Sequence, residues 1–173
     1  METLNMTQTG IDLKLLFIHQ LNRVNCTKDY LARNLPDLQG IASFNTMKLA
    51  IREDLEDVKK QQLRIDEMYR LLDSKASDEG CEVIKSVIEE AFNLSNNSGK
   101  STIINDMDII LYMQLIENIE LTSFRMLKMI AGFMGDDRIT QMVTECFDEN
   151  VDNDRLLTLI SEEYLERKTV EQK

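Results

Sequence analysis

The sequence predicts an all-α protein in which four long helices pack as an antiparallel bundle, with one short helix between the second and third of them. Little in the chain interrupts a helix, because its 173 residues include one proline and six glycines. Apolar side chains recur every three or four residues along four long stretches, the spacing of a helix that buries one face. A chain of this length forms one domain with a sizeable core.

The first two long helices are predicted over residues 10–34 and 42–73. Pro36 is expected to end the first helix, because proline lacks a backbone N–H and biases the preceding residue away from helix. Ser43 is expected to cap the second helix, since its hydroxyl can accept from a free N–H of the first turn. The two inward stripes are Phe17, Leu21, Val24, Leu31 and Leu35, and then Phe44, Met47, Ile51, Leu55, Val58, Gln62, Ile65, Tyr69 and Leu72.

The second half of the chain is predicted to begin with a short helix over residues 78–94. The polar segment 95–102 follows as a loop and is the clearest break in the sequence. The most apolar helix is predicted over residues 103–134, and Gly135 is expected to end it. The last helix is predicted over residues 137–167.

These helices are expected to form a single domain over residues 11–167, with flexible tails at 1–10 and 168–173. The short helix and the loop cross over between the two halves of the bundle. That arrangement is the ferritin-like variant of the four-helix bundle. Periodicity alone does not distinguish it from a bundle with plain up-and-down connections.

The charge balance argues against two classes of partner. The formal net charge is −11 with acidic side chains spread along the chain, whereas a nucleic-acid-binding surface needs clustered basic residues. No membrane span is expected, because the apolar segment 109–134 carries four charged side chains. No signal peptide is expected, since the first ten residues are polar.

The number and spacing of the cysteines indicate the cellular compartment in which the protein is expected. Cys26, Cys81 and Cys146 are odd in number, far apart and in no C-x-x-C pattern. Such a set is typical of small, reduced, buried side chains in the cytosol. A cytoplasmic protein is therefore expected.

No catalytic constellation is predicted. His19 is the one histidine in the chain, and it lies off the main apolar stripe of its helix. An inert, partly exposed histidine is favoured there over a member of a nucleophilic site.

Two carboxylates interrupt the most apolar helix. Glu117 and Glu120 lie on the row that also holds Met113, Phe124 and Leu127, so both should face protein. Burying an ionised carboxylate without a partner costs several kcal/mol, by order of magnitude. A metal ion, a lysine, a proton or a bound group should therefore accompany them.

The other long helices also become polar near mid-length. Lys28 lies on the apolar stripe of the first helix, and Glu56 and Lys59 lie beside the stripe of the second. We interpret Lys28, Glu56, Lys59, Glu117 and Glu120 as a core ion-pair network. Glu149 and Asn153 interrupt the stripe of the last helix, and Asp152 lies in the same acidic run.

Bundles that bind two metal ions use such a layer, with glutamates from two helices and Glu-x-x-His from the other two. No histidine follows Glu56 or Glu149 by three residues, so no metal and no cofactor are expected. The alternative is a carboxylate-rich site for iron, manganese or zinc. Its ligands would be drawn from Glu56, Glu117, Glu120, Glu149 and Asp152.

Three runs carry a resemblance to a known family: LFIHQL at residues 16–21, LRIDE at 63–67, and E-x-x-E-x-x-S-F at 117–124. Over residues 11–165 the chain resembles the YciE/YciF family of ferritin-like bacterial proteins. The resemblance implies a dimeric, cytoplasmic helical bundle that is associated with stress responses and lacks an established activity.

The resemblance also implies where this chain departs from its relatives. Metal-type members carry a glutamate at the position of Lys28 and Glu-x-x-His where this chain has Glu56 and, three residues on, Lys59. The acidic positions that match the family are Glu56, Glu117, Glu120, Glu149 and Asp152. These departures argue against a di-iron oxidase, peroxidase or iron-storage role.

The leading hypothesis is therefore a non-enzymatic, metal-free, ferritin-like homodimer whose protein partner, if any, is unknown. The alternative is a metal-binding protein or oxidoreductase of the ferritin-like superfamily. A third class is an interaction module, because the nearly all-round apolar helix over residues 103–134 could be buried at a dimer interface.

Overall fold

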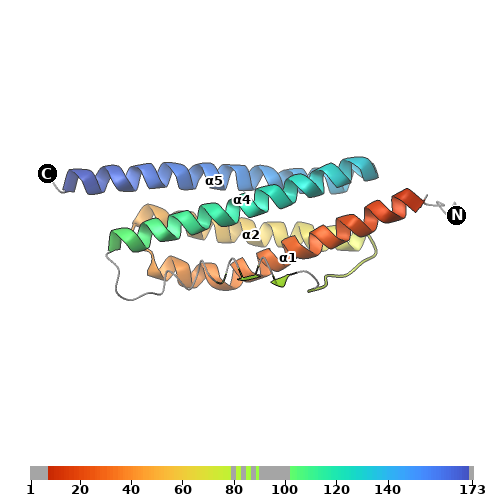
Figure 1. Cartoon of the computed structure of the whole chain (residues 1–173), viewed down its shortest axis with the longest axis horizontal. Helices are drawn as coiled ribbons and strands as arrows, with labels where there is room; N and C mark the ends of the chain where they lie inside the picture. The colour runs from red at the N-terminus through yellow and green to blue at the C-terminus, as the bar shows by residue number, and fades with distance from the viewer. Residues whose placement is uncertain (1–7, 79–80, 83–84, 87–88, 90–101, 172–173) are drawn as a thin grey trace.

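The computed structural model describes residues 8–78, 81–82, 85–86, 89 and 102–171 of the chain. Its long helices are α1 (Gln8–Ile41), α2 (Asn45–Leu71), α4 (Thr102–Met134) and α5 (Asp137–Glu171) (Figure 1). The described residues contain no β-strand. The prediction of an all-α bundle is confirmed.

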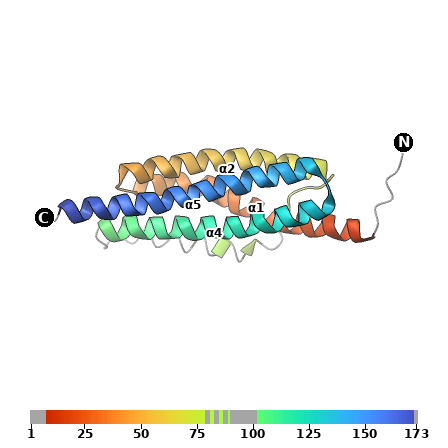
Figure 2. The same ribbon diagram turned by 90° about the horizontal axis from the view of Figure 1, so that it is seen from above.

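The four helices form an elongated bundle with a four-sided cross-section. α1 packs against α2 and α4, and α5 packs against the same two helices. Each helix runs antiparallel to the neighbours that it contacts (Figures 1 and 2). α2 ends at one end of the bundle and α4 begins at the other, so the connection between them must return along its length (Figure 1).

Pro36 does not end the first helix, which corrects the expectation from the sequence. α1 continues to Ile41 with Pro36 inside it. An internal proline costs about 3 kcal/mol in an isolated helix, because it removes one backbone hydrogen bond and crowds the previous turn. Leu35 and Leu38 are 0% and 4% exposed, so the apolar stripe continues past the proline, and burial of these side chains offsets its cost.

Ser43 does not cap α2. The helix begins at Asn45, and the residue at its N-cap position, Phe44, makes no side-chain capping hydrogen bond. The backbone N–H of Ser43 instead donates to Asp106 Oδ1 at 2.9 Å, and its hydroxyl donates to Asp106 Oδ2. Ser43 therefore ties the α1–α2 connection to α4, where Asp106 is 1% exposed.

The turn between α4 and α5 agrees with the predicted helix end. Gly135 has a φ of +71°, a conformation that favours glycine, and it follows the last residue of α4. Asp136 then caps α5, because its Oδ1 accepts from the backbone N–H groups of Arg138 and Ile139 at 3.0 and 3.1 Å.

The outer ends of the first and last helices also differ from the predictions. α1 begins at Gln8 and α5 continues to Glu171, so both helices extend into the predicted tails. Of the predicted short helix over 78–94, residues 82, 85, 86 and 89 are helical, and 79–80, 83–84, 87–88 and 90–94 lie outside the described residues. Of the predicted loop over 95–102, residues 95–101 also lie outside them, and Thr102 begins α4.

The core has two apolar parts. The first apolar cluster contains Leu31, Leu35, Leu38, Ala42, Met47, Ala50, Ile51, Val58, Ile109, Ile110, Met113, Ile116, Leu157 and Ile160. The second contains Phe17, Leu21, Val24, Ile65, Met68, Tyr69, Leu72, Phe124, Leu127, Ile130, Ala131, Ile139, Val143 and Cys146. Each helix contributes to both, and the two sets are separated at residues 25–30, 59–64, 117–123 and 147–156. The middle of the bundle is therefore where polar groups enter.

None of the helices described combines the length and the apolar character that a bilayer crossing needs.

Candidate functional site

Lys28 lies at the centre of the bundle with 1% of its surface exposed. Its Nζ donates to Glu120 Oε2 at 2.7 Å and also lies 2.7 Å from Oε1, so the ammonium faces both oxygens of one carboxylate. Burial lowers the pKa of Lys28, but the carboxyl groups of Glu120, Glu117 and Asp54 outweigh this effect and raise it. Lys28 is therefore a cation at neutral pH.

A chain of hydrogen bonds continues from this ion pair across the bundle. Asn150 of α5 is 0% exposed, and its Nδ2 donates to Glu120 Oε2 at 2.9 Å. Gln61 of α2 donates through Nε2 to Asn150 Oδ1 at 2.9 Å and to Glu149 Oε2 at 3.0 Å. All four long helices are thus linked through polar side chains at one level.

The chain ends at the edge of the bundle, where solvent has access. Arg64 donates to both oxygens of Glu149 at 2.8 Å, and its Nε lies 3.0 Å from Glu145 Oε2. The Arg64 and Glu149 side chains are each 23% exposed, in contrast to the 1% of the Lys28–Glu120 pair. This edge pair resembles a surface salt bridge more than a buried one.

Two further carboxyl groups are buried beside the ion pair. Asp54 and Glu117 are 5% and 1% exposed, and with Asn153 they line a cavity of about 10 Å³, close to the minimum for one water molecule. Burial raises the pKa of Asp54 to about 7 and raises the pKa of Glu117 well above its usual range. Glu117 Oε2 has no hydrogen-bond partner among the described residues.

These pKa shifts give the layer a simple charge balance. The ammonium of Lys28 neutralises the carboxylate of Glu120, with which it is in contact. Below their raised pKa values, Asp54 and Glu117 then avoid an uncompensated buried charge by holding protons, as desolvation favours for a carboxyl group. We call Lys28, Asp54, Gln61, Glu117, Glu120 and Asn150 the polar layer.

The structure brings together three of the five residues that the sequence assigned to an ion-pair network. Lys28, Glu117 and Glu120 meet, whereas Glu56 and Lys59 are exposed. The predicted five-membered network is corrected in this respect. The inward positions of α2 recur every three or four residues, from Ile51 through Val58 to Ile65. Glu56 and Lys59 fall between these positions and therefore point away from the core. Glu56 is 61% exposed and lies 3.9 Å from Arg52.

The acidic residues predicted on the last helix are also peripheral. Glu149 reaches the layer only through Gln61 and the edge pair with Arg64. Asp152 is exposed.

Three buried polar residues are absent from the network predicted from the sequence, namely Asp54, Gln61 and Asn150. Asp54 and Gln61 occupy heptad positions between Ile51 and Ile65, on the buried face of α2. Their spacing along that stripe is the signal in the sequence, although the charged row that holds Glu56 and Lys59 beside it is more conspicuous. Asn150 follows Cys146 by four residues on α5, the same kind of signal.

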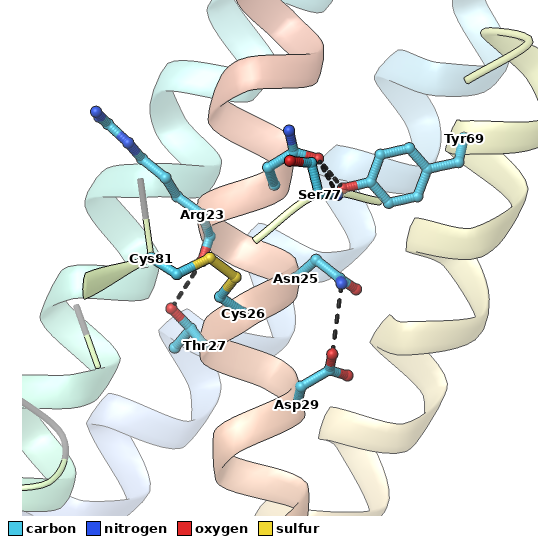
Figure 3. The surroundings of a disulfide bond; sticks show 9 residues. Arg23, Asn25, Cys26, Thr27, Asp29, Tyr69, Ser77 and Cys81 are labelled. Atoms are coloured by element: carbon cyan, nitrogen blue, oxygen red, sulfur yellow. Dashed lines mark hydrogen bonds between the residues drawn. A yellow bond between two sulfur atoms is a disulfide. The ribbon is translucent and has the colours of Figure 1, made fainter. Parts of the chain in front are cut away.

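A second polar cluster lies outside the layer, where the chain that follows α2 meets α1 (Figure 3). Cys26 and Cys81 form a disulfide with a Cα–Cα distance of 5.9 Å. Asn22 Oδ1 accepts from the Tyr69 hydroxyl at 2.7 Å and from the Ser77 N–H at 3.2 Å. The segment after α2 is thereby held against α1.

This disulfide corrects the expectation of three reduced, unpaired cysteines. Spacing of 55 residues in the sequence says little about distance when a long connection returns along the bundle. Cys146 is the one free cysteine, and its thiol is buried. Burial raises the pKa of that thiol to about 12, which makes it a poor nucleophile.

Comparison with known proteins places this chain in a family. A family described as a domain of unknown function, DUF892, matches residues 12–170. The chain belongs to this family. No curated protein matches the sequence.

The DUF892 chain is similar to several solved structures. The Escherichia coli stress protein YciF is 26% identical, with a TM-score of 0.80 over 86% of this chain and 93% of that one. YcfI from Rhodopseudomonas palustris is 21% identical, with a TM-score of 0.79 over 91% and 98%. A protein from Xanthomonas campestris is 12% identical, with a TM-score of 0.69 over 91% and 99%. The resemblance to YciE/YciF proteins is confirmed.

The polar layer of this DUF892 protein does not fit a di-metal centre. It supplies carboxyl groups from Asp54, Glu117 and Glu120, but no histidine. Among the residues that the structure describes, these three do not bring their ligand atoms within 4.8 Å of one another. An ammonium in contact with Glu120 also repels a second cation.

Proposed function

We propose that this protein is a metal-free, ferritin-like member of its family, in which an internal network of Lys28, Glu120 and their neighbours replaces a metal site. The observation that carries the proposal is the position of Lys28. Its ammonium lies 2.7 Å from the carboxylate that would otherwise be available to a metal ion. The layer then joins the four helices and fixes their register, with no reaction of its own.

The protonated state of the other carboxyl groups supports the same proposal. A divalent cation needs ionised oxygen ligands, so it would have to displace the protons of Asp54 and Glu117 as well as the lysine. This competition opposes metal binding most strongly below the pKa of about 7 of Asp54.

The direct experiment is the metal content of untagged protein by mass spectrometry, as purified and after incubation with iron, manganese and zinc. The disulfide-intact wild type is expected to bind none of them tightly in the layer. The matched variant is Lys28→Glu, which exchanges the repelling charge for a ligand and should bind iron or manganese more tightly. One or two tightly bound ions per wild-type chain, lost in Glu117→Gln, would contradict the proposal.

Tight metal binding in the polar layer would instead support the alternative function, that of a carboxylate-rich metal-binding protein or oxidoreductase. One observation favours it. Glu117 Oε2 is buried without a hydrogen-bond partner among the described residues and lies beside a small cavity. An orphaned carboxylate oxygen is the kind of group that a cation or an ordered water would satisfy.

We also propose that the protein acts in a bacterial stress response, within the cytoplasm. Its similarity to the E. coli stress protein YciF, at 26% identity, supports this role. Survival of a deletion strain of the source bacterium under peroxide, osmotic and acid stress tests it. Complementation by Lys28→Met, compared with the wild type, would show whether the role depends on the layer.

We further propose that the chain is a homodimer that uses the outer face of α4. This face leaves six large apolar side chains exposed, namely Ile104, Leu111, Leu115, Met126, Met129 and Phe133. Their recurrence along one helix supports burial against a second copy. Sedimentation velocity should show a dimer that Leu115→Lys weakens and the control Leu63→Lys, on α2, leaves unchanged. A strict monomer at all concentrations would contradict the proposal.

A further inference from the structure

Cys26 and Cys81 lie beside a third metal-ligating side chain, Asp78. One ligand atom from each of these residues lies within 4.8 Å of the other two. No other group of this kind occurs in the part of the chain that the structure describes. The ligands are two sulfurs and one carboxylate oxygen, in contrast to the polar layer, which offers oxygen only.

Local backbone structure explains why Asp78 and Cys81 face the same point. The N–H of Cys81 donates to the carbonyl of Asp78 at 3.4 Å, and the N–H of Lys85 donates to the carbonyl of Cys81 at 2.9 Å. These two bonds hold the backbones of Asp78, Cys81 and Lys85 close to one another. The Asp-x-x-Cys spacing matches that of the Cys-x-x-Cys pairs that hold zinc, with an aspartate in place of the first thiolate.

The third ligand comes from a rigid element. Cys26 lies within α1, where its side chain faces Cys81 (Figure 3). Asn22 Oδ1 accepts from the Tyr69 hydroxyl and the Ser77 N–H, and these two bonds, which do not involve the sulfurs, also hold the approaching segment near Cys26. The three ligands are therefore brought together by the fold as well as by the disulfide.

An open cavity of about 240 Å³ adjoins the cluster, which leaves room for a fourth ligand or water. It is lined by Cys26, Asp29, Tyr30, Arg33, Asp78, Cys81, Glu82 and Lys85. Its two cations are engaged, since Arg33 donates to the Asp29 carbonyl at 2.9 Å and Lys85 lies 4.0 Å from Glu89. The lining carries three carboxyl groups, of Asp29, Asp78 and Glu82, against these two cations, so it is acidic by one formal charge.

We propose that, when both cysteines are reduced, Cys26, Cys81 and Asp78 bind one zinc ion, and that zinc and the disulfide exclude each other. Thiolates favour zinc over magnesium or calcium, and a carboxylate completes a common set of zinc ligands. A tetrahedral zinc ion needs its sulfur ligands roughly 3.7 Å apart, which a disulfide forbids. Zinc binding at this site therefore depends on whether Cys26 and Cys81 are reduced.

The chemical step that opens the site balances as ordinary thiol–disulfide exchange. A dithiol reductant gives two electrons to the Cys26–Cys81 bond and becomes a disulfide, while its two protons pass to the separated cysteine sulfurs. Zinc then binds the thiolates and releases both protons to solvent. Disulfides in a cytosolic protein are usually of this reversible kind, so the proposal also accounts for a disulfide in a cytoplasmic protein.

The experiment compares zinc binding by the oxidised and reduced full-length protein. The protein is reduced with a phosphine, desalted without oxygen, incubated with zinc, desalted again, and its zinc per chain is measured by mass spectrometry. One zinc per chain is expected in the reduced form and none in the oxidised form. Cobalt titration should give a thiolate-to-cobalt absorption band in the reduced form alone.

Variants identify the ligands. Cys26→Ser should abolish binding, and Asp78→Asn should weaken it at least about tenfold, because a neutral amide is a poorer ligand for zinc. The matched control is Cys146→Ala, which removes the buried thiol remote from the cluster and should bind like the wild type. Circular dichroism of each variant checks that the bundle is folded.

Several outcomes would overturn the proposal. Equal zinc in the oxidised and reduced forms, no zinc in the reduced form, or undiminished binding in Cys26→Ser or Asp78→Asn would each do so. Zinc held in the polar layer would survive Cys26→Ser and be lost in Glu117→Gln. The failure of this inference is therefore distinguishable from the failure of the proposed function.

Discussion

The polar layer and the Cys26–Cys81 cluster both fasten α1 to another part of the chain, but by opposite means. The layer joins four helices through an ion pair that is 1% exposed, so each member depends on the charge of the others. The cluster joins two segments by one covalent bond next to an open cavity. The polar layer should therefore respond to proton concentration, and the Cys26–Cys81 cluster to reductant.

The largest effect is expected from Lys28→Met. This change leaves the Glu120 carboxylate buried without its ammonium, and breaking a buried ion pair costs about 3–5 kcal/mol of unfolding free energy. Urea melts followed by circular dichroism measure the loss. Replacing Glu120 as well, in Lys28→Met/Glu120→Gln, should recover much of it.

The control for this comparison is Lys59→Met. Lys59 is exposed, so its loss should change the free energy of unfolding by no more than about 0.5 kcal/mol. If Lys28→Met and the wild type unfold at the same urea concentration, the ion pair does not hold the layer together.

The next largest effect is expected from reducing the disulfide in the absence of zinc. The bond closes a loop with a sequence separation of 55 residues, and cross-links of this kind stabilise by about 2–4 kcal/mol. Urea melts with and without reductant should differ for the wild type and coincide for Cys26→Ser. If the free energy of unfolding of the wild type were the same with and without reductant, non-covalent contacts alone would hold the segment after α2 against α1.

A smaller effect is expected from pH, and it should belong to the layer alone. The pKa of Asp54 is about 7 in the folded protein against an ordinary value of 3.8, so between these values the folded state binds a proton that the unfolded state has lost. Its contribution to stability is therefore present at low pH and is lost as the pH rises to about 7.

We expect about 2 kcal/mol from this source, less than the full shift implies, because a water molecule could enter the adjoining cavity. Urea melts across pH 4.5–8 should show that Asp54→Asn flattens this dependence relative to the wild type. Asp152→Asn, at an exposed position, serves as the control. Parallel pH profiles for the wild type and Asp54→Asn would contradict the protonation that we infer.

The smallest effect is expected at the edge of the layer. Arg64→Met removes the pair with Glu149, whose side chains are each 23% exposed, and should cost about 1 kcal/mol or less. The cost should shrink in high salt, because solvent ions screen exposed charges. An Arg64→Met penalty as large as that of Lys28→Met would remove the distinction between the centre and the edge of the layer.

Much of the fold could be predicted from the sequence, because helix length and apolar spacing are local properties. The end of α4 at Gly135 is such a case. Pro36 is the opposite case. Its local preference for ending a helix is outweighed by burial of Leu35 and Leu38, which depends on what packs against them.

The site was only half predictable for a related reason. Glu117 and Glu120 could be found because they interrupt an otherwise apolar stripe. The prediction that Glu56 and Lys59 lie inside is wrong, because a rotation of α2 by about two residues exchanges its buried and exposed rows. The pairing of Cys26 with Cys81 could not be predicted, since it depends on the path of a connection that periodicity does not describe.

The covalent ring closed by Cys26 and Cys81 contains the second part of α1 and all of α2, whereas α4 and α5 lie outside it. A chain pulled from its two ends would therefore lengthen fully only outside the ring, before Cys26 and after Cys81. The stretch from Cys26 to Cys81, with a sequence separation of 55, would withhold about 190 Å of extended length until the bond is reduced. In a force experiment the disulfide-bonded protein would therefore unfold to a shorter contour length than the reduced protein.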